Sequence, residues 1–276
     1  MAIKDGFTLV VMGAGVMGSA FTSAILSAQV KPFPGKIHLC VHDGAETESL
    51  RSTYPQDYVH VWNDLEGRRK AASEADVIIL ACKPYTYKTI YEELKDSLTH
   101  KPLLLSLLAG ITIDQLSIYT PNVARIMTNT PAKYRCGMAT VAFSPAADSD
   151  QRDVVLKVAG TLGTAMEIPE KNMDAATALV GSGPAFCLLM MEALYDGGVR
   201  TGLQHDVART AAAKVMEGTA KMVLETGEHP AVLKSMVCTP GGTTIGGLLK
   251  MEDSGVRATI SRAVEEAAEI SASFSK

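Results

Sequence analysis

The sequence is poor in aromatic residues and has no surplus of positive charge. Aromatic side chains make up 5% of its 276 residues, with a single tryptophan, and the formal net charge is −4 at pH 7. Nucleic-acid-binding proteins neutralise phosphates with basic residues, so this charge balance argues against one. The hydrophobic fraction of 47% is ample for a folded core. The length predicts one large domain or two modest ones.

Cysteine and histidine are too scattered to suggest a disulfide framework or a structural metal. The five cysteines form no C-x-x-C pair, and the six histidines form no H-E-x-x-H motif. We therefore predict no metal site, and we interpret the cysteines as buried, reduced thiols of a cytoplasmic protein.

The sequence also has no apolar run long enough to suggest a membrane span. The most apolar stretch, Pro184–Tyr195, is shorter than the ~18–20 residues that a span needs, and it contains Glu192. We interpret it as a helix buried on nearly all sides. Because one domain rarely buries a helix so completely, we expect a subunit interface. The apolar run near the N-terminus leads into a glycine-rich turn, unlike a secretory signal.

Up to about residue 165, the chain alternates strand-length apolar runs with helix-compatible segments. This alternation predicts a doubly wound, mostly parallel α/β sheet with helices on both faces. The residues from Thr112 to Gln115 have the form of a capping box, so a short helix is expected there. The predicted strands are Phe7–Met12, Ile37–Val41, Val77–Cys82, Leu103–Leu107, Val123–Met127 and Met138–Phe143.

From about Lys171 onward the strand-like runs disappear, and alanine, methionine, glutamate and lysine dominate. This change predicts a boundary near residue 168, with an α/β domain at 1–168 and an all-helical domain at 169–276. The predicted helices are Asp174–Val180, Pro184–Gly197, His205–Glu225, Pro230–Met236, Thr244–Glu252 and Gly255–Ser273.

A glycine motif follows the first predicted strand. Gly13, Gly15 and Gly18 form G-x-G-x-x-G between a strand and a helix. The first glycine permits a tight turn, the second lets the backbone approach a pyrophosphate, and the third permits close packing of helix on strand. The helix N-terminus then offers N–H groups to the phosphates. This context predicts dinucleotide binding.

Two further positions point to the same ligand. Asp43 follows the second strand, where an acidic residue commonly binds the ribose 2′-hydroxyl and disfavours a 2′-phosphate. It therefore favours NADH, although His42 and Arg51 are placed to contact a phosphate and Asp43 can equally be a solvated or capping carboxylate. Lys83 and Pro84 follow the third predicted strand, at the sheet edge where ligands bind. An exposed loop lysine is the alternative there.

Six stretches are similar to one enzyme family, in that family's order and over almost the full chain. On these motifs the chain resembles pyrroline-5-carboxylate reductase, the enzyme that makes proline. The stretches are VMGAGVMG at 11–18, ADVIILACKP at 75–84, LLSLLAGITIDQL at 104–116, RIMTNTPA at 125–132, ALVGSGPAF at 178–186 and VCTPGGTTIGGL at 237–248.

The resemblance implies a Rossmann domain at 1–168 and an all-helical domain for substrate binding and dimerisation at 169–276. It implies a homodimer or an assembly of dimers that reduces the C=N bond of 1-pyrroline-5-carboxylate with NADPH or NADH. Two positions depart from the family pattern, because many members have proline at Thr128 and a basic residue near Asp43. The resemblance implies cofactor contacts at Gly13, Gly15, Val16, Met17, Gly18, His42, Asp43, Lys83, Pro84, Ala109 and Asn129.

The stretch at 237–248 interrupts a helical region with a proline and four glycines. We interpret Pro240, Gly241 and Gly242 as a tight turn before a helix whose N-terminus holds a carboxylate. The resemblance implies that Thr244 offers its hydroxyl to the imine nitrogen and is the catalytic residue. It implies substrate contacts at Thr239, Gly242, Thr243 and Thr244. For Gly181–Pro184, a helix break without chemistry is the favoured interpretation.

Three other functions are compatible with parts of this pattern. A β-hydroxyacid dehydrogenase would carry a lysine on the helix that begins near Pro184, and this helix has none. A reductase of a related five- or six-membered cyclic imine differs by little, because one methylene is worth only ~1–3 kcal/mol of discrimination. A non-catalytic dinucleotide sensor would have no need of the PGGTT segment.

Overall fold

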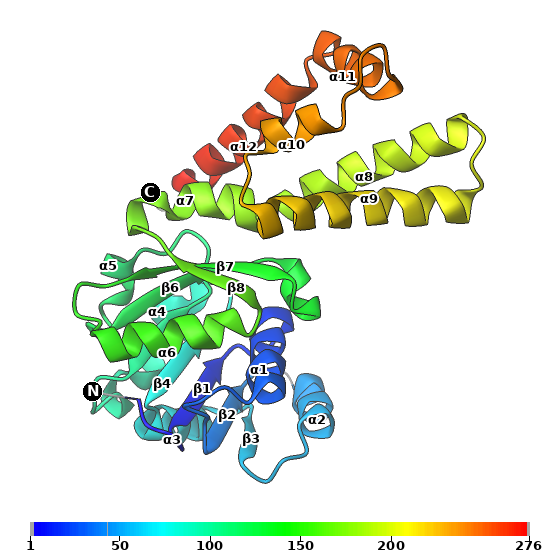
Figure 1. Ribbon diagram of the computed structural model, residues 1–276. Coiled ribbons are helices and arrows are strands. Elements are labelled where there is room, and N and C mark those ends of the chain that lie inside the picture. Colours follow the sequence, from blue (N-terminus) through cyan, green and yellow to red (C-terminus); the bar gives the residue numbers. More distant parts are fainter. Residues whose placement is uncertain (1–2, 43, 275–276) are drawn as a thin grey trace. The chain divides into compact units, whose positions relative to one another are not determined.

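The computed structural model describes residues 3–42 and 44–274 (Figure 1). It divides into two compact units: the residues up to Gly181 together with those from Ala267 onward, and Ser182–Glu266. The first unit therefore extends beyond residue 168, the boundary expected from the sequence. The end of the chain joins it through contacts such as the hydrogen bond from Ser271 Oγ to Asp174 Oδ1, 2.7 Å.

The first unit is built on an eight-stranded sheet with the order β3-β2-β1-β4-β5-β6-β7-β8. Strands β1 to β6 are parallel, β7 is antiparallel to β6, and β8 is parallel to β7. The predicted doubly wound sheet is confirmed, but its two edge strands, β3 and β8, were not predicted. The strands are β1 (Thr8–Met12), β2 (Lys36–Cys40), β3 (Val59–Trp62), β4 (Val77–Leu80), β5 (Leu103–Ser106), β6 (Val123–Met127), β7 (Gly137–Phe143) and β8 (Gly163–Glu167).

Helices cover both faces of this sheet (Figure 1). One face packs on α1, α2 and α6, and the other on α3, α4 and α5. The predicted capping box at Thr112 is present at the start of α5. The helices are α1 (Val16–Ala28), α2 (Gly44–Thr53), α3 (Leu65–Glu74), α4 (Tyr87–Leu94), α5 (Ile113–Leu116) and α6 (Ser149–Gly160), followed by α7 (Met173–Ala176) and a π-helical turn (Thr177–Gly181).

A partly buried ion pair holds the segment that leaves the sheet. Glu170 Oε1 accepts hydrogen bonds from Arg125 Nη1 of β6, 2.9 Å, and from the backbone N–H of Ile113, 2.7 Å. The Arg125 side chain is 7% exposed and that of Glu170 is 35% exposed. A single carboxylate thus links β6, α5 and the segment leading to α7.

His38 lies in the core beneath α3, beside the single tryptophan. Its Nδ1 accepts a hydrogen bond from Trp62 Nε1, 2.9 Å. Burial lowers the pKa of His38 to about 4, against the opposing influence of Glu74. His42, four residues on, is exposed beyond the end of β2. The two histidines therefore do not share a helix face, as a zinc-binding H-x-x-x-H pair would.

The second unit is helical throughout its described length, with α8 and α9 as an antiparallel pair (Figure 1). Gly227 ends α9 with a φ of 66°, the left-handed conformation that glycine adopts without strain. The predicted helices are confirmed to within three residues at each end. They are α8 (Gly183–Arg200), α9 (His205–Thr226), α10 (Pro230–Met236), α11 (Thr243–Asp253) and α12 (Val256–Ser273), of which α12 belongs to the first unit from Ala267 onward.

The expectation that the helix from Pro184 is buried on nearly all sides is wrong for the single chain. No residue of α8 is buried, and Leu189 is 67% exposed. The length argument against a membrane span also fails, because helix continues from Glu170 to Arg200 over 31 residues. This helix is long and apolar enough to cross a membrane, but core helices of soluble proteins can also have this length and composition. The apolar side chains of α8 are therefore left exposed to solvent in the single chain.

Candidate cofactor and substrate sites

The turn between β1 and α1 has the geometry that a dinucleotide requires. Gly13 has a φ of 96°, and a Cβ added to it would lie 2.7 Å from the backbone nitrogen of Cys82. A Cβ on Gly18 would lie 2.4 Å from the carbonyl oxygen of Gly13, whereas a Cβ on Gly15 would meet no atom within 4 Å. The first and third glycines thus serve close packing, and the second leaves space for a ligand.

Helix α1 presents a free N-terminus at this turn. Gly15 is its N-cap, no side chain caps it, and its first turn carries no acidic residue. Val16, the first helical residue, is 88% exposed. Uncapped N–H groups and the positive end of the helix dipole suit a pyrophosphate. The residues present therefore fit a nicotinamide dinucleotide.

The other predicted cofactor residues follow three parallel strands at the same edge of the sheet. Lys83 and Pro84 follow β4, half-buried Ala109 follows β5, and Asn129 follows β6. Lys83 is exposed, with its Nζ 6.0 Å from the centroid of the Tyr85 ring. The amide oxygen of Asn129 accepts from the backbone N–H of Met138, 3.2 Å. Their contact with a cofactor stays a prediction.

The ribose end of the expected site is described only in part. His42 is exposed just beyond β2, and Asp43 lies outside the described residues. Arg51 stands in the last turn of α2, and its Nη2 donates to the carbonyl oxygen of Val61 on β3, 3.4 Å. Arg51 is therefore directed to the edge strand, and of the two candidate phosphate contacts only His42 lies directly at the end of β2.

A cavity of about 460 Å³ lies along α1 in the first unit. Three predicted cofactor residues, Val16, Met17 and Asn129, are among its lining residues. Sequence analysis missed its two basic residues, Lys133 and Arg135, although they stand only four and six positions after Asn129. The remaining lining residues are Ser19, Ala20, Ser23, Ala24, Ser27, Thr53, Tyr54, Thr130 and Ala132.

The predicted substrate segment of the second unit forms a turn before α11. The backbone N–H of Gly242 donates to the carbonyl oxygen of Thr239, 3.0 Å, and Gly241 has a φ of 67°. Pro240 and Gly241 at the two central positions are typical of a type II turn. Gly242 is the N-cap of α11, and no side chain caps the helix. The predicted turn and free helix N-terminus are both present, and α11 begins at Thr243 rather than at Thr244.

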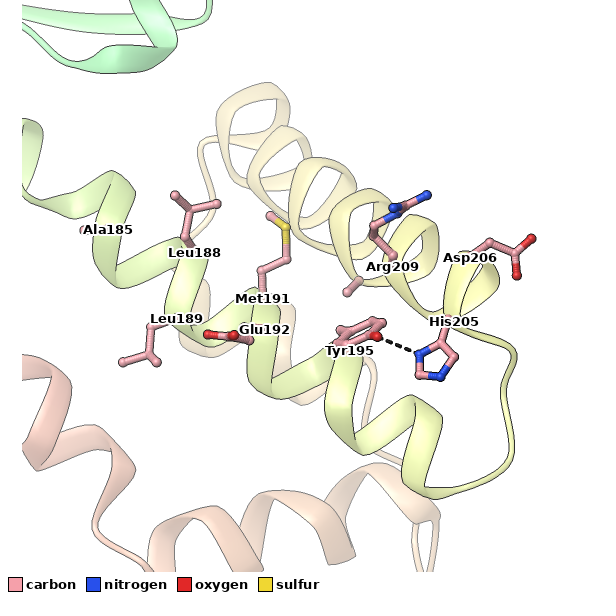
Figure 2. Close-up of a pocket in the computed structure, with 10 residues that line it drawn as sticks. Ala185, Leu188, Leu189, Met191, Glu192, Tyr195, His205, Asp206 and Arg209 are labelled. Carbon is pink, nitrogen blue, oxygen red and sulfur yellow. Dashed lines mark hydrogen bonds between the residues drawn. The ribbon is translucent and has the colours of Figure 1, made fainter.

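A groove of about 870 Å³ runs between α8 and α9 in the second unit (Figure 2). Leu188 and Leu189 line it together with polar residues near the α8–α9 turn. There Tyr195 Oη and His205 Nδ1 form a hydrogen bond of 2.6 Å, a pair that sequence analysis did not single out. The surface of the groove is mainly apolar, and part of it belongs to α8, the helix that has no buried residue.

Comparison with known proteins agrees with both units. Residues 170–274 match the family described as pyrroline-5-carboxylate reductase dimerisation, and residues 8–110 match the family described as NADP oxidoreductase, coenzyme F420-dependent. The chain is 44% identical over 277 residues to a pyrroline-5-carboxylate reductase of Kluyveromyces lactis, covering 96% of each chain. It is 36% identical to that of Schizosaccharomyces pombe, covering 96% of this chain and 98% of that one.

Solved structures give the same result. The pyrroline-5-carboxylate reductase of Coxiella burnetii superposes with a TM-score of 0.88 at 27% identity, covering 99% of this chain and 100% of that chain. The Plasmodium falciparum pyrroline carboxylate reductase with NADP bound superposes with a TM-score of 0.84 at 26% identity, with the same coverage.

The sheet, the glycine turn and the helical second unit define an NAD(P)H-dependent oxidoreductase of the Rossmann class. The similarity extends through both units and over nearly the whole length of the relatives. The chain belongs to the pyrroline-5-carboxylate reductase family.

Proposed function

We propose that this chain reduces the C=N bond of 1-pyrroline-5-carboxylate to L-proline with NADPH or NADH, as the last step of proline biosynthesis. The observation that carries the proposal is the similarity over nearly the full length to reductases of that name. The glycine turn supports it, because the space beside Gly15 is open and the start of α1 is uncapped. The nicotinamide, when bound, supplies the hydride.

In this proposal the start of α11 binds the substrate carboxylate. Backbone N–H groups of its first turn are uncapped by any side chain, and they suit a carboxylate. Thr239, Gly242 and Thr243 lie at this start, and a Cβ added to Gly241 would meet no atom within 4 Å. Thr244 then offers its hydroxyl to the ring nitrogen.

The proton for the imine nitrogen needs a separate source. A threonine hydroxyl orients the nitrogen but is a poor acid. In this proposal the substrate binds with its nitrogen already protonated, or water delivers the proton. The protein's contribution is then orientation and electrostatic stabilisation of the reacting group.

Initial rates of cofactor oxidation with DL-1-pyrroline-5-carboxylate test the proposal, with NADPH and NADH in parallel. Turnover with either cofactor supports it, and the ratio of the two kcat/KM values reports which ribose the β2–α2 turn accepts. Absence of turnover in protein that binds the cofactor refutes it. 1-Piperideine-6-carboxylate, the six-membered homologue of the substrate, is the comparison substrate that would reveal a homologous reductase.

We also propose that a second copy covers the apolar face of α8 and α9. Leu188 and Leu189 are 62% and 67% exposed, and they line the groove shown in Figure 2. The match of residues 170–274 to a dimerisation family supports this. Contact with a partner chain would bury these leucines, and each Å² of apolar surface removed from water stabilises the complex by roughly 25 cal/mol. The proposed assembly is a homodimer or an assembly of dimers in the cytoplasm, where the five free thiols would stay reduced. The expectation that these thiols are buried holds in the single chain only for Cys40, and Cys136 and Cys187 are exposed.

Sedimentation velocity of two glutamate variants tests this surface. Leu189→Glu places a charge in the groove and should shift the protein toward monomer. Ile118→Glu, an exposed position of the first unit, is the control and should leave the oligomer intact. A dimer of unchanged stability in Leu189→Glu would place the interface elsewhere.

A further inference from the structure

Lys133 and Arg135 form a cationic rim on the cavity along α1. Lys133 is the fourth of the five residues of the short 3₁₀ helix Thr130–Tyr134, and Arg135 follows that helix directly. Both side chains are exposed and line the cavity. Neither forms an ion pair with any described residue, and none of the lining residues is acidic. In a chain with a net charge of −4, this is a local excess of two positive charges.

The backbone at Arg135 adds a second observation. Arg135 has a φ of 58° and is the C-cap of the 3₁₀ helix, with its N–H donating to the carbonyl oxygens of Ala132 and Pro131. Glycine or asparagine adopts this left-handed conformation more easily than arginine does. Glycine would thus cap the helix equally well, so the cap itself does not require an arginine side chain.

The residues that line the cavity beside the rim indicate which anion Lys133 and Arg135 would attract. Val16 and Met17 line the cavity from the first turn of α1, where the pyrophosphate of a dinucleotide is expected. Asn129, which follows β6, lines the same cavity, and the resemblance implies that its segment lies beside the nicotinamide. A carboxylate substrate must approach the nicotinamide to be reduced. Lys133 Nζ lies 5.9 Å from the centroid of the Tyr134 ring, and neither cation has an acidic partner among the described residues. Two such cations beside that approach favour a small carboxylate over a neutral or cationic competitor.

We propose that Lys133 and Arg135 form an electrostatic selectivity element that attracts the carboxylate of the imine substrate to the nicotinamide end of the cavity. This inference rests on the proposed function. Each charge should change kcat/KM by about fivefold at low ionic strength, because two unit charges about 4 Å apart in bulk water interact by about 1 kcal/mol and both side chains are exposed to water. Screening should remove most of this effect in about 0.5 M salt.

Steady-state kinetics of charge-neutral variants test the proposal at saturating cofactor. Lys133→Gln and Arg135→Gln should each raise KM for 1-pyrroline-5-carboxylate about fivefold in 20 mM salt with little change in kcat, and the double variant should raise it about 25-fold. Arg135→Lys should keep most of the wild-type KM. Lys88→Gln is the matched control, because Lys88 is an exposed lysine of α4 on the other face of the sheet, with no ion pair to a described residue.

Arg135→Gly separates this role from a structural one. Glycine keeps the left-handed cap, so the variant should unfold at an equal or higher temperature than the wild type. Its KM should nevertheless rise as in Arg135→Gln. A stable Arg135→Gly variant with wild-type KM in low salt would overturn the assignment of Arg135.

Direct binding of NADPH and NADH, measured by their fluorescence, identifies the anion. The proposal requires dissociation constants within about twofold of wild type in the double variant. If these constants rise while KM for the imine stays unchanged, the rim binds a cofactor phosphate and the substrate assignment is overturned. If neither quantity changes, the rim has no role in binding. Absence of turnover by the wild type would instead refute the proposed function itself, and this inference with it.

Discussion

Alanine at Gly15 should abolish tight cofactor binding while leaving the fold almost untouched. Gly15 has a φ of −70°, which alanine adopts freely, and its added Cβ would meet no atom within 4 Å. The stability should therefore change by less than about 1 kcal/mol, the usual range for this change at an N-cap. The methyl group would instead stand where a pyrophosphate approaches the backbone.

The loss in binding follows from the hydrogen bonds that the methyl group displaces. A hydrogen bond to a charged group is worth roughly 1.5–3 kcal/mol. Losing the equivalent of one such bond, about 2–3 kcal/mol, weakens binding by roughly 30- to 150-fold. Isothermal titration with NADPH and NADH measures this loss, and urea denaturation measures stability in the same preparation.

Gly18→Ala is the informative comparison. Its Cβ would lie 2.4 Å from the carbonyl oxygen of Gly13, so the helix or the turn must shift. Overpacking of this kind costs about 1–3 kcal/mol of stability. Gly18→Ala should therefore lose both stability and binding, whereas Gly15→Ala loses binding alone. Wild-type affinity in Gly15→Ala would refute the argument that the backbone at this glycine touches the cofactor.

Three further results are expected. Glu170→Ala should destabilise the protein by about 2–4 kcal/mol in urea denaturation, because it leaves the largely buried Arg125 guanidinium without its partner; a loss below about 1 kcal/mol would contradict this. The depressed pKa of His38, about 4 when folded against about 6.5 unfolded, means that the unfolded chain binds the extra proton between these values. The free energy of unfolding should therefore fall by up to about 3 kcal/mol as pH decreases from 6.5 to 4. The fluorescence of Trp62 reports the unfolding transition, and His38→Gln should flatten its pH dependence. An unchanged pH profile in that variant would exclude His38 as the cause. Thr244→Val should lower kcat/KM for the imine by about 10-fold or more without changing cofactor affinity, and an unchanged kcat/KM would remove Thr244 from the mechanism.

Sequence patterns predicted the long, locally determined elements well. The helix Pro230–Met236 was predicted with the bounds that the structure has, and the strand Val123–Met127 likewise. Strand β3 was missed because it is a four-residue edge strand with only one buried residue, so it has no continuous apolar run. Its place at the sheet edge depends on pairing with β2, which no local pattern reports.

The candidate site was predictable where its chemistry depends on backbone freedom. Gly13, Gly15 and Gly18 signal their roles through spacing alone, because the turn that they form is local. The resemblance alone directed attention to Thr239 and Thr244. Lys133 and Arg135 were missed because only the fold brings them beside α1, more than a hundred residues earlier in the chain.

The sequence by itself determined the alternation of strands and helices along the chain, the dinucleotide turn and the family. Each of these depends on residues close together in the chain or on motifs in a set order. Only the tertiary structure decided the order of the strands within the sheet, the hydrogen bond from Arg51 to Val61, the ion pair of Arg125 with Glu170, and the exposure of α8. These features arise from contacts between distant segments, and their stability depends on which side chains packing brings together and which it leaves in water.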